Sequence, residues 1–260
     1  MKLGPLGTDQ IADLRPYFDS VSDPRARRGW WYSLTAFLLV CACAAVSGAR
    51  SIDELAEWGQ RASNTLLTLI GIRRHLLRWR RTPSSVTIGR VLRAVDGDAL
   101  DGVVDAYLAD RHRAATGLAE APSPSASGRP RVIAVDGKAL RGSARLTVTR
   151  RHLLSAVTHG TVVTLAQMEV GAKTNEATYF RPLLAPLDLT GTVVTFAEDA
   201  STVHAGTAPR AMATLRNLAI GVLKTLGADN IAKTTRAIRD EPQRALPILG
   251  TTNDPDTYGT

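Results

Sequence analysis

A proline- and serine-rich stretch in the middle of the chain separates two halves whose apolar residues repeat with different periods. Residues 117–130 contain three prolines, mostly small side chains and no bulky anchor beyond Leu118, a composition typical of a linker. Apolar residues before this stretch recur at helical spacing, whereas short β-branched runs after it favour strands. The sequence therefore predicts an α+β protein with a helical domain over residues 1–116, a linker over 117–130 and an α/β domain over 131–260.

Capping residues mark several helices of the first half. Ser33 can cap a helix that runs through residues 34–46 to Gly48, and the capping box Ser51–Glu54 opens the next helix. The apolar run 34–46 is shorter than the roughly 20 residues that cross a bilayer, so it predicts a buried helix and no membrane partner. Further helices are expected over residues 11–18, 84–95, 98–113, 209–226 and 231–240.

The two cysteines of the chain, Cys41 and Cys43, lie in this apolar run. Cysteines one residue apart cannot form an ordinary structural disulfide, and the neighbouring sequence supplies no other metal ligands. We therefore expect buried thiols in a protein of the reducing cytoplasm.

The balance of charge favours a polyanionic partner. The chain carries a formal net charge of +8 and a sequence pI near 10.0, and residues 58–95 contain eight arginines and no acid. We predict that this stretch contacts DNA, with a helix-turn-helix as one possible form; the alternative is a helical packing domain with solvated arginines. Arg210 and Arg216, on the last long helix, are further candidates to face DNA. The residues expected to bind DNA in the basic stretch are Arg73, Arg74, Arg78, Arg80 and Arg81.

A single carboxylate closes the first predicted strand of the second half. Val132 to Asp136 is a β-branched run, and Gly137 allows a sharp turn after it. Basic residues follow, beginning with Lys138 and Arg141. A carboxylate facing cations suits phosphodiester chemistry, in which the carboxylate binds a divalent metal and the cations bind phosphates. The alternative is an ordinary strand that ends in an Asp-Gly turn.

The rest of the second half alternates strands and helices. Residues 151–158 and 161–170 are expected to form a hairpin around His159–Gly160. A helix capped by Asn175 and a strand over residues 192–196 follow. This order predicts the beginning of an α/β sheet.

Five strings of the sequence are similar to DDE transposases of bacterial insertion sequences, in the H-repeat-associated branch. They are D-P-R-A-R-R-G at residues 23–29, the segment 131–143, K-T-N-E at 173–176, F-A-E-D-A-S at 196–201 and A-P-R-A-M-A-T-L-R-N-L-A-I at 208–220. The resemblance implies that residues 131–260 form a ribonuclease H-like catalytic domain with Asp136 as the first catalytic acid. It also implies a Mg²⁺ or Mn²⁺ cofactor held by Asp136, with Lys138 or Arg141 positioning the scissile phosphate.

The resemblance also implies the partners and the location of the protein. The expected partner is DNA, namely the terminal inverted repeats of an insertion sequence. A second copy of the chain or a full-length transposase is a further possible partner. The expected location is the cytoplasm, in association with the nucleoid.

The resemblance breaks where the family carries its second catalytic acid. That aspartate is expected directly after the string G-T-V-V-T, near position 197, which is alanine in this chain. At residues 195–196 the chain passes into F-A-E-D-A-S, a string that the family carries well downstream. The second acid, and the helix that carries the third, are therefore expected to be missing through an internal truncation. Glu198 and Asp199 belong to the downstream string, and whether either replaces a lost acid stays open.

Three functions follow from these observations, and whether the chain is an enzyme stays open. The first is an insertion-sequence transposase that is a truncated, catalytically defective copy. The second is a non-catalytic DNA-binding remnant that interferes with a full-length transposase. The third, a ribonuclease H-like nuclease of another process, is disfavoured because the amino-terminal strings are similar to transposases. Phosphate-binding loops, esterase nucleophile motifs and paired-cysteine zinc motifs are absent from the sequence.

Overall fold

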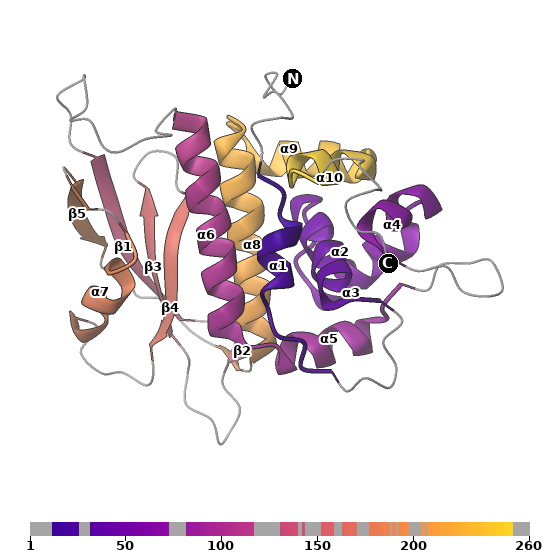
Figure 1. The fold of residues 1–260 in the computed structure, drawn as a ribbon, viewed down its shortest axis with the longest axis horizontal. Helices are drawn as coiled ribbons and strands as arrows, with labels where there is room; N and C mark the ends of the chain where they lie inside the picture. Colours follow the sequence, from indigo (N-terminus) through magenta and orange to yellow (C-terminus); the bar gives the residue numbers. More distant parts are fainter. Residues whose placement is uncertain are drawn as a thin grey trace.

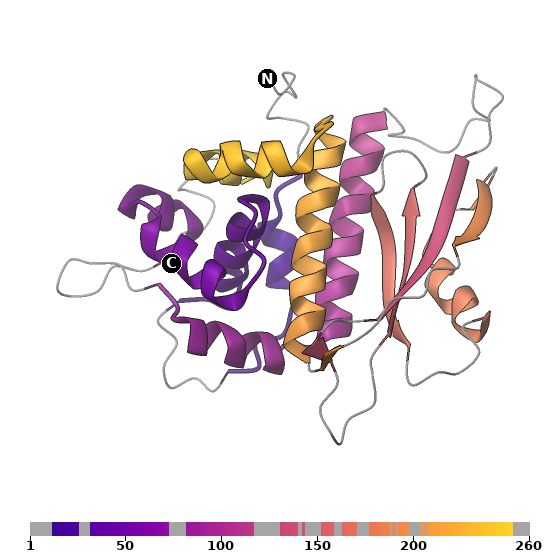
Figure 2. The ribbon, with the colours of Figure 1, turned by 180° about the vertical axis from the view of Figure 1, so that it is seen from behind.

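Helices and a small mixed sheet make up the fold, which confirms the expected α+β class. The computed structural model describes residues 12–25, 32–72, 82–116, 131–139, 142–143, 152–158, 163–170, 177–187, 189–190, 192–197, 204–205 and 207–251. Within these residues, most of the shorter helices lie on one side, the sheet and the short helix α7 lie on the other, and two long helices run between them (Figures 1 and 2).

The helices of the first half follow the sequence pattern closely. They are α1 (Arg15–Asp19), α2 (Leu34–Val46), α3 (Ile52–Arg61), α4 (Asn64–Ile70), α5 (Ser85–Ala94) and α6 (Gly97–Thr116). The hydroxyls of Ser33 and Ser51 accept hydrogen bonds from the amides of Ala36 and Glu54, as expected of N-caps. Gly48 follows α2 with a φ of 90°, a conformation that costs glycine little. Two helices differ clearly: α1 begins at Arg15 and is shorter than expected, and α4 was not predicted as a separate helix.

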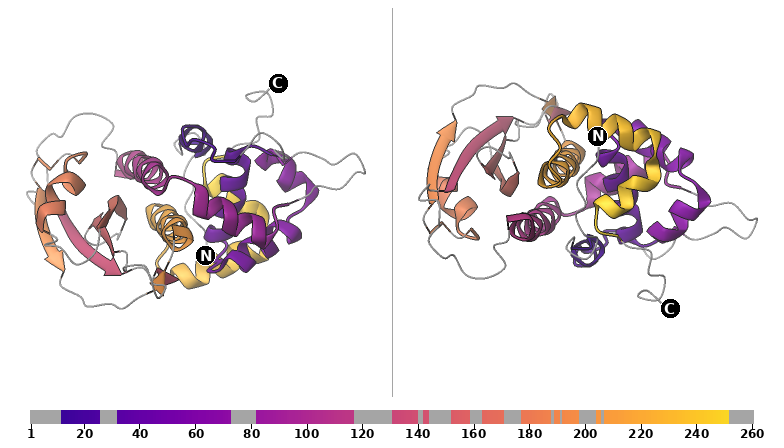
Figure 3. Two further views of the ribbon diagram at one scale, coloured as in Figure 1. Left: turned by 90° about the horizontal axis from the view of Figure 1, so that it is seen from below. Right: turned by 90° about the horizontal axis from the view of Figure 1, so that it is seen from above.

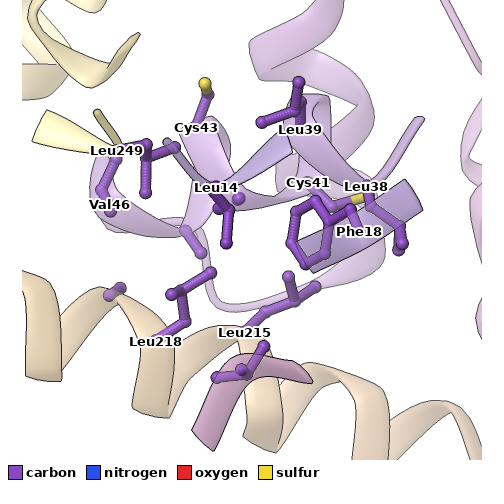
Figure 4. Close-up of a cluster of buried hydrophobic side chains, with 14 of the residues drawn as sticks. Leu14, Phe18, Leu38, Leu39, Cys41, Cys43, Val46, Leu215, Leu218 and Leu249 are labelled. Atoms are coloured by element: carbon purple, nitrogen blue, oxygen red, sulfur yellow. The ribbon is translucent and has the colours of Figure 1, made fainter. Parts of the chain in front are cut away.

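Helix α2 forms the centre of the helical side. Every residue of α2 except Thr35 is buried, and the helix contacts α1, α3, α8 and α10. Figure 4 shows its leucines and cysteines among the side chains of α1 and α8. Cys41 and Cys43 are free and buried, and burial raises the pKa of both thiols. The prediction of a buried apolar helix is confirmed, and no helix in the described part of the chain is long and apolar enough to cross a membrane.

The end of the chain returns to the helical side and completes its core. Helix α8 (Thr207–Thr225) packs against α2, α5 and α6, and is followed by α9 (Ile231–Asp240), η2 (Pro242–Arg244) and α10 (Ala245–Ile248). The amide of Leu14 donates to the carbonyl of Leu249 over 3.2 Å, and Leu14, Leu215 and Leu249 belong to one buried cluster (Figure 4). The boundaries expected at residues 117 and 130 stay a prediction, but the hydrophobic core contains residues from both sides of them.

The sheet has the strand order β4-β3-β1-β5. Its strands are β1 (Arg131–Ala139), β3 (His152–Thr158), β4 (Thr164–Val170) and β5 (Thr192–Ala197), and α7 (Ala177–Leu184) precedes β5. β3 is antiparallel to both β1 and β4, whereas β5 is parallel to β1. The antiparallel pairing of β3 with β4 confirms the two strands of the expected hairpin, and its turn at His159–Gly160 lies outside the described residues. A separate ladder joins β2 (Gly142–Ser143) to β6 (His204–Ala205), which the sequence did not predict.

The two faces of the sheet are covered unequally. Ile133 and Val135 of β1 point to a buried face, and α7 packs on β3 and β4 from that side (Figure 3). The opposite face carries Asp136, which is half-buried, and Val193 of β5, which is 45% exposed. Helices α6 and α8 lie on this second side (Figure 3) and contact the sheet at β4. We call this second face the open face.

Candidate catalytic strand and the polar junction beside it

Asp136 lies within β1 rather than at its end. The strand continues through Gly137, which pairs with Leu154 of β3, to Ala139. The expected sharp turn at Gly137 is therefore wrong, because the length of β3 provides backbone hydrogen-bond partners beyond Asp136. On the other side of β1 the ladder does end here, since Asp136 and Ala197 are the last paired residues of β1 and β5.

The register between β1 and β5 shows which residue lies beside Asp136 on the neighbouring strand. Asp136 and Ala197 are Cα partners on adjacent parallel strands. Residues paired in this way lie side by side in a sheet. The position at which the resemblance places the second aspartate therefore neighbours the first acid, but it is an alanine in this chain.

A row of polar residues runs across the open face from Asp136. Asp136 pairs with Ser155 of β3, and Ser155 pairs with Gln167 of β4. The Ser155 hydroxyl donates to Oε1 of Gln167 over 3.4 Å, and the side-chain amide of Asn217 on α8 donates to the same oxygen. The row thus connects the candidate catalytic strand to the long carboxyl-terminal helix.

Within the described residues, the neighbours of Asp136 do not supply the carboxylates that a two-metal site needs. Two-metal phosphoryl transfer needs carboxylates on both sides of ions that lie about 4 Å apart. Ser155 and Ala197 are the neighbours of Asp136 across the sheet, and neither is an anionic ligand. Among the described residues no three His, Cys, Asp or Glu side chains are placed to share an ion. Glu198 and Asp199 lie outside the described residues.

Most of the residues expected to bind DNA cannot be placed. Arg73, Arg74, Arg78, Arg80, Arg81 and Arg141 lie outside the described residues. The backbone of Lys138 belongs to β1 and pairs with Leu153 of β3. The DNA-binding role of all seven residues stays a prediction.

A buried ion cluster joins α6, α8 and β4 next to the polar row. Its centre is Arg210 of α8, which is 6% exposed. The guanidinium donates to Asp101 over 2.8 Å, to Asp98 over 2.6 Å and to Glu169 over 2.9 Å, and the hydroxyl of Thr214 donates to Asp101. Asp101 itself is 1% exposed, so the forked guanidinium offsets a carboxylate that has almost no water. We call these five residues the polar junction.

Burial dominates the acid–base behaviour near the polar junction. Desolvation raises the pKa of the Asp101 carboxyl, although Arg210 and the hydrogen bond from Thr214 oppose that rise. Asp105, one helical turn further along α6, lies beside the junction and accepts a 2.7 Å hydrogen bond from the backbone amide of Gln167. Burial, together with the negative charge of Asp101, raises the pKa of Asp105 to about 8. Asp105 therefore binds a proton at neutral pH, unlike an ordinary carboxyl group.

Sequence reasoning missed this polar junction and misplaced Arg210. Arg210 does not face DNA as expected, because its three carboxylate partners hold it in the interior; Arg216, by contrast, is exposed. The helical spacing of polar residues in two predicted helices could have indicated the polar junction. Arg210, Thr214 and Asn217 lie on one side of α8, and Asp98, Asp101 and Asp105 lie on one side of α6.

Comparison with known proteins shows a similarity to transposases. Residues 16–108, which span α1 to most of α6, match the family model described as DDE_Tnp_1-associated. The chain is 26% identical over 187 residues to the putative transposase YncI of Escherichia coli O157:H7, and equally identical to YncI of strain K12. The first half of the chain thus resembles the DDE_Tnp_1-associated family, and the chain as a whole is similar to putative transposases.

These family relatives are longer than the region they share with the chain. The YncI matches cover 71% of the chain and 43% or 68% of the two proteins. A protein of Xanthobacter autotrophicus described as uncharacterized, in the dhlA 3′ region, is 28% identical over 182 residues, which cover 69% of the chain and 56% of that protein. The chain thus spans about half the length of the Xanthobacter protein and of YncI of Escherichia coli O157:H7. No solved structure matches it.

Proposed function

We propose that this protein is a DNA-binding, catalytically defective copy of an insertion-sequence transposase. The observation that carries the proposal is the register of the parallel strands β1 and β5. It pairs Asp136 with Ala197, so that the chain has an alanine at the position where the family resemblance requires the second acid. The similarity to transposases supports the proposed class of protein, and the alanine in place of the second acid supports the proposed catalytic defect.

The strand order supports a ribonuclease H-like origin for the sheet. Three antiparallel strands, β1, β3 and β4, are followed by a helix and by a strand that returns parallel to β1. The resemblance places the first acid on the first strand and the second acid just after the strand that follows the helix. The location of Asp136 on β1, and of Ala197 at the end of β5 beside it, supports this assignment.

The open face supports the loss of an internal segment. Strand β5 carries an exposed valine, Val193, and α6 and α8 contact the sheet at β4, the opposite edge. In an intact catalytic domain, the segment between the second acid and the downstream string F-A-E-D-A-S contributes another strand and the helix with the third acid. A truncation near residues 195–196 removes the elements that would continue the sheet beyond β5.

DNA binding does not require the lost acids. Non-specific affinity for DNA comes mainly from cations that neutralise phosphates, and the chain has a net charge of +8. The acid-free stretch 58–95 supplies eight of these cations. We therefore expect affinity for DNA to persist without strand cleavage, so that the protein competes with a full-length transposase for the terminal inverted repeats.

The test incubates the purified chain with DNA carrying the terminal inverted repeats of its element, in Mg²⁺ and separately in Mn²⁺. We expect a shifted complex in a gel and intact strands after the incubation. Asp136→Ala should bind as the wild type does and should also leave the strands intact. Cleavage by the wild type that disappears in Asp136→Ala would overturn the catalytic defect and direct attention to Glu198 or Asp199. Absence of any complex would overturn DNA binding.

A further inference from the structure

Helix α5 exposes a large apolar side chain with a cation one turn further on. Val86 is 68% exposed, the highest value among the large apolar side chains that the structure describes. Arg90 follows four residues later and is also exposed. Residues at this spacing lie on the same side of a helix. Arg90 forms no ion pair with any described residue, so its charge faces outward.

The opposite side of α5 is fixed by packing. Ile88, Val91 and Leu92 are buried, and the helix contacts α3 and α8. Gly89 is buried as well, and a methyl group at this position would lie 3.0 Å from the guanidinium of Arg93. The exposed side therefore belongs to a helix that is packed against α3 and α8 and capped at Ser84. In Figure 1 this helix lies along the lower margin of the molecule.

The basic sequence around α5 favours a polyanionic partner for its exposed side. The helix closes the acid-free stretch 58–95, and the five arginines expected to bind phosphates precede it. An exposed valine side chain contributes little hydrophobic free energy to folding. Contact with a thymine methyl group in the major groove would remove its apolar surface from water. Arginine forms the commonest specific contact in that groove, a paired hydrogen bond to guanine.

We propose that α5 enters the major groove of duplex DNA and reads bases through Val86 and Arg90. Four residues correspond to about 6 Å along a helix, close to two base-pair steps. The two side chains can therefore reach neighbouring positions on one strand. This inference rests on the proposed DNA binding and adds the element and the residues that select the sequence.

The test is selection from a random-sequence duplex library bound by the full chain. The wild type should enrich a short motif that contains a guanine near a thymine. Arg90→Gln should reduce the preference for that guanine roughly 5- to 150-fold, the range of one good base contact. Val86→Ser should reduce the preference at a neighbouring position by less. Binding to unselected duplex should change little in either variant, because most phosphate contacts remain.

Matched controls separate base reading from the loss of charge. Arg236→Gln removes an exposed cation from α9, at the opposite margin of the molecule, and Val193→Ser changes the exposed valine of β5. Both should enrich the wild-type motif. The inference is overturned if the wild type binds DNA without enriching any motif, or if Arg90→Gln and Val86→Ser enrich the wild-type motif unchanged. Failure of the wild type to retain any duplex would overturn the proposed function as well.

Discussion

The helical side of the molecule and the sheet differ in how completely they bury their apolar side chains. On the helical side, α2 is buried almost throughout because α1, α3, α8 and α10 surround it. In the sheet, one face is buried beneath α7, whereas the open face leaves Val193 45% exposed. The carboxyl-terminal helices thus complete the core of the amino-terminal helices. Burial of the sheet is less complete, as expected if the proposed truncation removed its other neighbours.

The largest effect is expected where the two regions meet. Arg210→Met removes the guanidinium from the polar junction and leaves Asp101 buried without a counter-charge. Breaking a buried pair in this way costs about 3–5 kcal/mol. Unfolding in urea should show this loss, whereas Arg216→Met, an exposed change on the same helix, should stay within about 0.5 kcal/mol. Adding Asp101→Asn to Arg210→Met should recover part of the loss, and equal stability of the two arginine variants would contradict the prediction.

A matched pair of truncations compares the cores of the two regions directly. Leu218→Ala opens a cavity among fully buried side chains of the helical core, at a cost of about 2–5 kcal/mol. Val193→Ala removes two methyl groups from the open face and should cost only about 0.5 kcal/mol. Chemical denaturation of both variants, followed by circular dichroism, measures the difference. Similar losses would mean that the open face is covered in solution.

A smaller effect is expected from Asp105, and it depends on pH. Because the pKa of Asp105 is raised to about 8 in the folded protein, the folded state keeps a proton that the unfolded chain releases above pH 4 or so. The stabilisation of the folded state by protonated Asp105 is therefore complete below about pH 4. This stabilisation is lost as the pH rises to about 8. Asp105→Asn retains an oxygen acceptor for the amide of Gln167 but cannot ionise.

Unfolding free energies at acidic and alkaline pH provide the measurement for this substitution. The gain of Asp105→Asn over the wild type should grow with pH and reach roughly 1–3 kcal/mol at about pH 9, less than the full linkage value because buried sites relax. Asp240→Asn, an exposed change on α9, should follow the wild type at every pH. If Asp105→Asn also follows the wild type, Asp105 is ionised at neutral pH.

Local signals in the sequence predicted the helices well and the long-range contacts poorly. A serine cap and a glycine stop placed α2 correctly, because a cap satisfies backbone groups of its own helix. Apolar spacing placed α5 to within one residue. The length of β1 was underestimated, since pairing with β3 outweighed the turn tendency of Gly137. The role of Arg210 was also missed, because its three carboxylates come from α6 and β4, more than 40 positions away in the chain.

The sequence by itself determined the α+β class, the order of the main helices and strands, the relation to transposases and the alanine at position 197. Each of these depends on local composition, on short-range spacing or on strings that can be read along the chain. Only the tertiary structure decided that Asp136 and Ala197 are neighbours and that α8 joins the amino-terminal helices to the sheet edge. Strand register and helix packing depend on residues distant in sequence, whose contacts become favourable only when both partners leave water together.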